Sequence, residues 1–401
     1  MGRTYYVDSR SKGGDGLSPE KAASTYRDLN ILPGDKVLFC RGSIFRDALF
    51  VPDGEADAPV YFGAYGEGSK PSFLGSVDLS DPACWVEERK HIWRCVKPLS
   101  SEVGNLIFSG GESCGILAWE EENLDAQGKW HDTRIGQREA ARENSEYRVF
   151  LYSSENPGLY YSHIEAAVYG ARRMCAAKKH AVIEDIAFRY SGVHGFTSVN
   201  GHDITMRRCD FEFIGGVVWS RELRIRFGNA FELWDDCHDV TMEECRCREI
   251  YDSCFTHQGP GEKCRVARNL CVKGNYFENY GMAAYEARDK VTANMLFENN
   301  VCIGAGLGFS MQDETPPRKS EIWPQPMGHH LFIWRMPKGS EGGCIEVRNN
   351  VFGAAPYGAH VYSIVSPEAE AQFRFENNRH DLSNTLIPAW WGGEKRTKIS
   401  E

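Results

Sequence analysis

The sequence predicts an all-β protein, and within that class a right-handed parallel β-helix. Three observations predict it: short segments of one form recur along the second half of the chain, each alternates apolar and polar residues, and an asparagine returns at one place in four of them. Alternation with a period of two is typical of a strand with one buried face. Because each segment is too short to bury that face alone, the segments must stack on one another.

The recurring segment has the form apolar-x-apolar-x-x-(Asn, Cys or Ile)-x-(Phe or Cys), and its last copy ends in His. Successive copies begin 23, 36, 30, 25, 50 and 28 residues apart, so the base period is about 23–30 residues, with two long insertions. We expect the second apolar residues of the seven copies to anchor successive coils; they are Ile183, Met206, Met242, Val272, Phe297, Val347 and Phe375.

The sixth position of the last four copies is always asparagine, at Asn275, Asn300, Asn350 and Asn378. Asparagines that repeat at one place in stacked coils can form a ladder of amide hydrogen bonds. Asparagine also marks turns with left-handed backbone. Both interpretations place the four residues at one bend of the coil.

The rest of the chain is assigned around a single β-helix domain that runs from about residue 30 to about residue 385. Residues 181–385 form its regular coils, and residues 120–165 form an insertion that includes a hairpin over residues 150–161. Since a solenoid must cover its end coils, we expect residues 1–30 to cap one end and residues 386–401 to form a tail at the other.

Composition limits the partners. The 401 residues include 40 glycines and 12% aromatic residues, which suits a turn-rich β architecture, and the net charge is −10. Nucleic acid binding needs a basic surface, so nucleic acid is not an expected partner. No run of eighteen apolar residues is present, which argues against a membrane span. The oligomeric state stays open.

The fourteen cysteines are expected to be buried free thiols. Most stand where a small hydrophobic residue would stand in a strand, and no CxxC pair is present. The N-terminus lacks the apolar core of a signal peptide. These features favour the cytoplasm, although a secreted protein whose signal peptide had been removed would show the same pattern.

A second strand follows each anchor by about twelve residues, and it carries the candidate catalytic residues. Alternation places Thr197, Glu232, Thr256 and Glu286 on one face, with the last three in successive coils. Stacked strands lie about 4.8 Å apart, so the backbones of Glu232 and Glu286 should be roughly 9–10 Å apart. This suits the roughly 6.5–9.5 Å between the two carboxyl groups of an inverting glycosidase. A solvated face of the coil is the alternative interpretation.

We expect a sugar-binding cleft around this column, because tryptophan stacks on sugar rings while amide and guanidinium groups bind hydroxyls. Arg288 would keep Glu286 ionised, and Glu232, between Phe231 and Trp234, would be the acid. A lone histidine such as His257 is also common in a packed core. The candidate substrate-binding residues are Trp234, Asp235, Asp252, His257, Gln258, Tyr285, Arg288 and Gln312.

Several stretches resemble the β-helix proteins of the pectin-lyase-like superfamily. They are Tyr6-Val7-Asp8, Gly14-Asp15-Gly16, Pro33-Gly34-Asp35, Gly63–Pro71, Phe227–Trp234 and Ile250–Gly259. The last two are similar to segments of β-helix glycoside hydrolases of the group that contains bacterial xylanases and α-fucosidases. The resemblance covers most of the chain and implies the fold and a carbohydrate substrate. It does not select one sugar, because the same fold also hosts lyases, epimerases and phage tailspikes.

Three classes of function follow. The first is glycoside hydrolysis of an oligosaccharide or polysaccharide by paired carboxylates. The second is a polysaccharide lyase or uronate epimerase, a class in which Arg or Lys abstracts a proton and acidic residues often hold Ca²⁺. The third is a carbohydrate-binding β-helix without catalysis. No nucleotide-binding or metalloprotease motif is present, so neither an organic cofactor nor a metal site is predicted.

Overall fold

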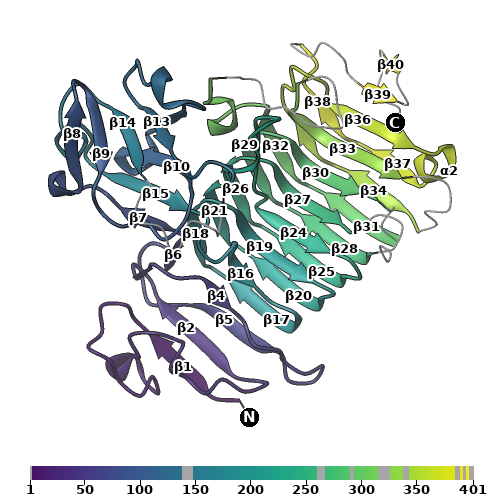
Figure 1. Cartoon of the computed structure of the whole chain (residues 1–401). Coiled ribbons are helices and arrows are strands. Elements are labelled where there is room, and N and C mark those ends of the chain that lie inside the picture. Colours follow the sequence, from purple (N-terminus) through teal and green to yellow (C-terminus); the bar gives the residue numbers. More distant parts are fainter. Residues whose placement is uncertain are drawn as a thin grey trace.

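A computed structural model describes residues 2–137, 148–259, 267–289, 293–314, 326–336, 343–383, 389–391 and 394–396. Its strands form a right-handed parallel β-helix, in which each coil adds one strand to each of three long sheets, named A, B and C (Figure 1). Neighbouring strands within each sheet are parallel, except for the last two strands of sheet C.

The bounds of the strands follow the order of each sheet. Sheet A contains β1 (Thr4–Val7), β2 (Lys36–Cys40), β5 (Val60–Tyr65), β17 (Lys179–Glu184), β20 (His202–Arg207), β25 (His238–Glu243), β28 (Arg268–Lys273), β31 (Ala293–Glu298), β34 (Ile345–Arg348) and β37 (Phe373–Glu376). Sheet B contains β3 (Ile44–Phe45), β6 (Ser72–Leu74), β18 (Ala187–Ser191), β21 (Asp210–Ile214), β26 (Arg246–Ile250), β29 (Tyr276–Tyr280), β32 (Val301–Ala305), β35 (Val351–Phe352) and β38 (Arg379–His380). Sheet C contains β4 (Leu49–Phe50), β16 (Arg173–Ala176), β19 (His194–Val199), β24 (Phe231–Trp234), β27 (Ser253–Gln258), β30 (Ala283–Arg288), β33 (His329–Met336), β36 (His360–Val365), β39 (Ala389–Trp391) and β40 (Glu394–Arg396).

The predicted register of sheet A is confirmed. The seven anchors pair in order from Ile183 to Phe375, each one strand from the next. Their side chains point into the coil, where they meet the inward columns of the other two sheets, such as Phe188 and Phe211 in sheet B and Phe231 and Phe255 in sheet C. One continuous apolar core therefore runs along the solenoid.

The asparagine ladder is also confirmed. The side-chain amide nitrogen of each asparagine donates to the oxygen of the next, over 2.9 Å from Asn275 to Asn300, 3.1 Å from Asn300 to Asn350 and 2.9 Å from Asn350 to Asn378. The left-handed residue of the bend is instead the one before, for example Asn299 and Asn349 with φ of 55° and 57°. The bend therefore uses one position to turn and the next to form hydrogen bonds between coils.

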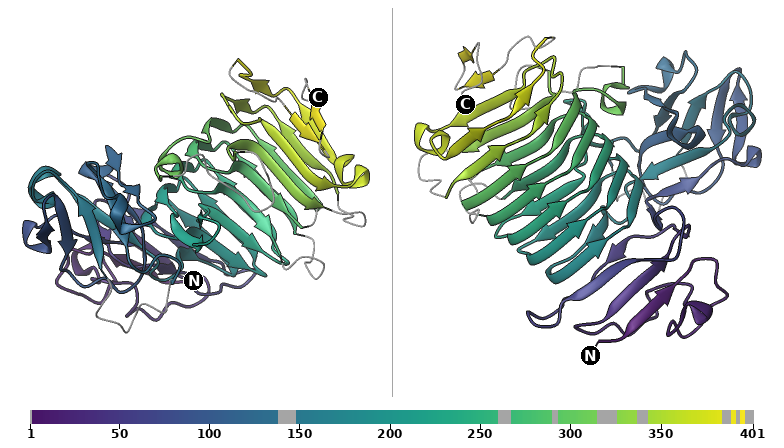
Figure 2. Two further views of the ribbon diagram at one scale, coloured as in Figure 1. Left: turned by 45° about the horizontal axis from the view of Figure 1, so that its top comes forward. Right: turned by 180° about the vertical axis from the view of Figure 1, so that it is seen from behind.

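A separate β unit interrupts the coils between residues 76 and 168 and projects from one side of the solenoid (Figures 1 and 2). One of its sheets has the order β11-β10-β15-β7, the other β12-β13-β14-β9-β8, and it has its own apolar core. Its elements are β7 (Ser76–Asp78), η2 (Pro82–Cys84), β8 (Trp85–Arg89), β9 (Ile92–Cys95), β10 (Val103–Phe108), η3 (Ser109–Gly111), β11 (Ser113–Cys114), β12 (Ile116–Leu117), η4 (Glu121–Asn123), β13 (Lys129–Asp132), β14 (Val149–Tyr152), α1 (Pro157–Tyr160) and β15 (Ile164–Val168).

The sequence placed an insertion at residues 120–165, whereas strands outside the coils already begin at Ser76. The predicted hairpin over residues 150–161 is wrong. Strand β14 pairs with β13 and β9, and the chain then enters the short helix α1. Asn156 caps this helix by accepting from the Gly158 backbone N–H at 3.0 Å, and Pro157 suits its first position.

Shorter elements complete the fold: the hairpin of β22 (Val217–Ser220) and β23 (Ile225–Phe227), together with η1 (Pro19–Lys21), η7 (Phe309–Met311) and α2 (Pro367–Glu370). At the N-terminal end, the ring of Tyr26 packs edge-on against Phe39, Phe62 and Phe73 and closes the core. No helix in the described part of the chain is long and apolar enough to cross a membrane.

The thirteen cysteines within the described residues are all free thiols, and nine of them are buried. Cys264 lies outside the described residues. Cys271 and Cys344 are half-exposed rather than buried. Cys271 stands between the inward-facing Leu270 and Val272, so its side chain points outward.

Candidate functional site

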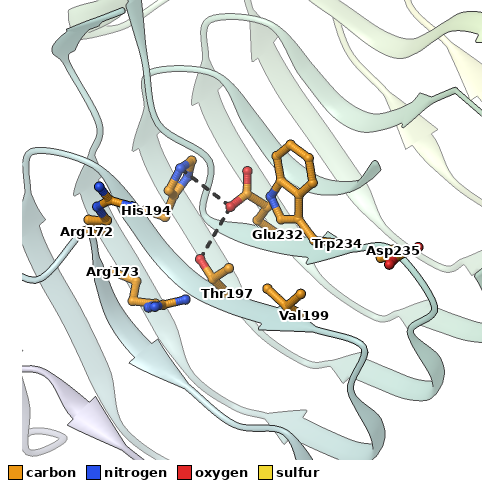
Figure 3. Close-up of a pocket in the computed structure, with 8 residues that line it drawn as sticks. All are labelled: Arg172, Arg173, His194, Thr197, Val199, Glu232, Trp234 and Asp235. Atoms are coloured by element: carbon orange, nitrogen blue, oxygen red, sulfur yellow. Dashed lines mark hydrogen bonds and ion pairs between the residues drawn. The ribbon is translucent and has the colours of Figure 1, made fainter. Parts of the chain in front are cut away.

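A pocket of about 410 Å³ opens on the outer face of sheet C (Figure 3). Strands β16, β19 and β24 and the residues that flank them line it with Arg172, Arg173, His194, Thr197, Val199, Glu232, Trp234 and Asp235. Glu232 is the buried carboxyl group of this set, with 3% of its surface exposed. It points outward because its neighbours on the strand, Phe231 and Leu233, belong to the core inside the coil.

The two carboxylate oxygens of Glu232 have different surroundings. Oε1 accepts hydrogen bonds from Gln258 Nε2 at 2.7 Å and from Asn229 Nδ2 at 3.1 Å. Oε2 has only longer contacts, 3.4 Å to the Thr197 hydroxyl and 3.5 Å to His194 Nε2 (Figure 3). One oxygen is thus fixed by amide donors, while the other remains available to a ligand.

His194 is oriented by a backbone hydrogen bond. Its Nδ1 accepts from the Asn229 N–H at 3.1 Å, so in the neutral ring the proton stands on Nε2, which faces Glu232. Asn229 therefore contacts both His194, through its backbone N–H, and Glu232, through its side-chain amide.

Glu286 lies two coils further along the same column, as predicted. The register is Thr197, Glu232, Thr256, Glu286 in successive strands of sheet C. A hydrogen-bonded path also joins the two carboxylates: Asn229 Oδ1 accepts from the Ser253 N–H at 3.0 Å, and the Ser253 hydroxyl donates to Glu286 Oε2 at 3.0 Å.

Glu286 is fully buried and does not line the pocket. Its Oε1 accepts from Arg288 and from the Trp334 indole N–H at 2.9 Å, and the Arg288 guanidinium stacks over Trp334 at 4.2 Å. Burial acts to raise the pKa of Glu286, but the charge of Arg288 and the hydrogen bonds of Trp334 and Arg288 outweigh it and lower the pKa below its usual value. Glu286 is therefore an ionised carboxylate enclosed by donors.

Four further predicted residues lie on this outer face. Trp234 and Asp235 line the pocket, Gln258 donates to Glu232, and Arg288 donates to Glu286. Two polar atoms beside or in the pocket, Gln258 Oε1 and Arg173 Nε, are buried without a hydrogen-bond partner among the described residues. Such atoms are uncommon in folded proteins and often mark a place where a ligand or water binds.

Two predicted residues point the other way. His257 pairs with Leu233 and Ala287, which face the core, and its Nε2 lies 3.0 Å from the Tyr285 hydroxyl inside the coil. Burial lowers the pKa of His257 to about 4. His257 and Tyr285 are core residues, so their prediction as substrate-binding residues is wrong; the alternation along the strand, followed strictly, separates them from Glu232.

Asp252 and Gln312 also lie away from the pocket. Asp252 is buried at the start of β27, where its carboxylate accepts from the Gly228 N–H at 2.9 Å. Gln312 follows η7, and its carbonyl oxygen accepts from the Leu117 N–H of the inserted unit. The next strand of sheet C is β33, with Phe332 opposite Glu286. The sequence analysis placed Gln312 in the next coil of sheet C, but a long insertion delays that coil until β33, so the prediction for Gln312 is wrong.

The inserted unit holds the β22–β23 hairpin close to the pocket. Glu102 accepts from the Val218 N–H at 2.9 Å, and the buried Arg226 donates to Gly216 and Gly104 carbonyl oxygens at 2.6 Å each. On the hairpin, Trp219 has 53% of its surface exposed and packs edge-on against Phe227. Phe227 in turn lies 5.6 Å from the ring of His194. An aromatic path thus leads from the pocket onto the hairpin.

Among solved structures, the chain is similar over nearly its full length to one described as a glycoside hydrolase, with 9% identity, 98% of this chain and 97% of that chain covered, and a TM-score of 0.55. A rhamnogalacturonan lyase has a TM-score of 0.49 with 10% identity, covering 94% of this chain and 74% of the other. A family 28 exopolygalacturonase from Yersinia enterocolitica has a TM-score of 0.45 with 13% identity, covering 90% and 64%. No family model matches the chain, and no curated protein matches it in sequence.

The chain shares a parallel β-helix fold with this glycoside hydrolase. Within this fold, the sequence did not predict His194, Asn229, Ser253 and Trp334 as parts of the site. His194 is the first residue of β19, and Asn229 stands shortly before β24. The predicted column used only later residues of these two strands, so including the residues at the strand beginnings would have found both. Trp334 follows the long insertion, where the repeat can no longer be counted.

Proposed function

We propose that the chain is a glycoside hydrolase that acts on an oligosaccharide or polysaccharide, with Glu232 as its proton-transferring carboxyl group. The supporting observation is Glu232 in the pocket, with Oε1 fixed by two amide groups and Oε2 held only at 3.4–3.5 Å. Proton transfer to the oxygen of a glycosidic bond is assigned to Oε2, since a general acid must lie within hydrogen-bond reach of that oxygen.

The second carboxylate of the mechanism is assigned to Asp235, which lines the same pocket three residues further along the chain. A carboxylate that activates water or attacks the sugar must contact it, and the fully buried Glu286 lacks this access. Glu286 acts instead as a positioning residue. Its carboxylate accepts from the Ser253 hydroxyl, and the Ser253 N–H donates to the side chain of Asn229. Asn229 in turn donates to Glu232 and so orients it. Trp234 offers a ring face to the substrate.

Three variants test these roles on a substrate found by screening nitrophenyl glycosides and plant or microbial oligosaccharides. Glu232→Gln and Asp235→Asn should each lower kcat by about 10²–10⁴, with the fold intact by circular dichroism. Glu286→Gln should lower kcat less and alter the pH profile of kcat/KM, because it acts through Glu232. Normal turnover of Glu232→Gln would refute the proposal, and a larger loss in Glu286→Gln than in Asp235→Asn would make Glu286 the second catalytic carboxylate.

A second candidate is a polysaccharide lyase that acts on a uronate. Arg172 and Arg173 line the pocket, and a guanidinium matches a carboxylate in geometry and charge. The products distinguish the two reactions, because a lyase forms an unsaturated sugar that absorbs ultraviolet light, whereas a hydrolase forms only new reducing ends. A binding protein without catalysis would form neither.

A further inference from the structure

Outside the pocket, two histidines and an aspartate meet on the outer side of sheet A. Asp203 Oδ2 lies 2.7 Å from His202 Nδ1 and 3.3 Å from His180 Nδ1. The two imidazole rings are 4.9 Å apart and nearly perpendicular. One ligand atom from each of the three residues falls within 4.8 Å of the other two.

The backbone brings these side chains together from two coils. His180 and Asp203 occupy equivalent positions of β17 and β20, between the paired residues Lys179–His202 and Ala181–Ile204. Both have left-handed backbone, with φ of 48° and 54°. Asp239 continues this column with φ of 53°, and His202 stacks on His238 at 4.9 Å. The column explains why aspartate is favoured at Asp203, but it does not require a histidine at 180 and another at 202.

We infer that His180, His202 and Asp203 bind a divalent transition metal ion, for which zinc is the typical ion. Two imidazoles and one carboxylate are a zinc ligand set, and zinc at about 2.0–2.2 Å from its ligands separates them by about 3.3 Å. The 3.3 Å contact between Asp203 and His180 already matches this separation, and the 2.7 Å contact between Asp203 and His202 must open by about 0.6 Å. Each imidazole would bind through Nδ1 and keep its proton on Nε2, and water would complete the tetrahedron on the exposed side.

A metal ion here would connect two coils next to the pocket. His202 begins the strand that follows Val199, which lines the pocket, so the bound ion would hold the turn between them. This inference is independent of the proposed function, because none of the three ligands lines the pocket.

Calorimetric titration of the full chain with zinc chloride near pH 7, after alkylation of accessible thiols, tests the inference. We expect one ion per chain, and at least about tenfold weaker binding in His202→Ala and in Asp203→Asn. Asp239→Asn is the matched control, because Asp239 makes the same kind of contact to His238, at 2.6 Å, and the described residues place no third ligand atom beside that pair. Zinc should also raise the Tm of the wild type but not that of Asp203→Asn.

Absence of binding at micromolar zinc would overturn the inference. So would equal weakening by Asp239→Asn and Asp203→Asn, because the ion would then lie elsewhere.

Discussion

At the scale of single residues, buried asparagine side chains fix how the coils stack, in addition to the columns of apolar side chains. Asn300 uses its whole side chain: Nδ2 donates to the Val272 carbonyl at 3.0 Å and to Asn350, and Oδ1 accepts from the Asn275 backbone and side chain. A fully buried amide that makes four hydrogen bonds to three residues fixes the register of neighbouring coils, because a shift by one residue would break all four.

Asn300→Ala should therefore lower the free energy of unfolding by about 1–3 kcal/mol, since it leaves buried donors of Asn275 without an acceptor. Chemical denaturation followed by circular dichroism measures this loss. Asn123→Ala is the control, because Asn123 is exposed and donates to Glu314 at the surface. Equal stability of the two variants would show that the ladder contributes little.

At the scale of elements, the β22–β23 hairpin joins the inserted unit to the pocket and carries the exposed Trp219. If the substrate is a sugar chain that extends over the hairpin, Trp219→Ala should raise KM for long oligosaccharides about threefold to tenfold. Short nitrophenyl glycosides, kcat and Tm should change little. Leu223→Ala, an exposed residue between the same two strands, is the matched control. Loss of activity on short and long substrates alike would contradict this role.

The elements also show what sequence could predict. Where coils follow one another directly, alternation and the repeat predicted the pairing of Glu232, Thr256 and Glu286 residue by residue. Where an insertion interrupts the count, as before β33, the prediction for Gln312 failed. Alternation also does not show whether other side chains bury an outward-facing residue. The sequence places Glu286 on an outer face, but its burial depends on Arg288 and on Trp334 of the following coil.

At the scale of the whole molecule, the C-terminal coils contain histidines inside the solenoid instead of only apolar residues. His330 is buried between two partners: its Nε2 donates to the Gly353 carbonyl at 2.7 Å, so its Nδ1 accepts from the Tyr280 hydroxyl at 2.6 Å. His360 Nε2 lies 3.2 Å from His380 Nε2, so one of the two must be the acceptor. The accepting ring of each contact must be neutral, because an imidazolium has no acceptor nitrogen.

Burial lowers the pKa of His330 to about 3 and of His380 to about 4, and it also lowers the pKa of His360, all from the ordinary value of 6.5. Between about pH 6.5 and pH 4 the unfolded chain therefore takes up protons that the folded chain does not. The free energy of unfolding should fall in this window as the pH decreases, by up to about 1.4 kcal/mol per pH unit for each such histidine.

His360→Phe tests this origin of acid sensitivity, because the ring fits between Phe352 and Phe375, which lie 5.5 and 5.6 Å from His360. The variant removes one titrating group, so its free energy of unfolding should fall less steeply with decreasing pH than that of the wild type, by up to about 1.4 kcal/mol per pH unit. Chemical denaturation at several pH values between 7 and 4.5 gives both slopes. Equal slopes would contradict a contribution of His360 to the acid sensitivity. Glu286 does not account for a slope in this range, because its lowered pKa makes its stabilising contribution disappear only as the pH falls below its usual value of 4.5.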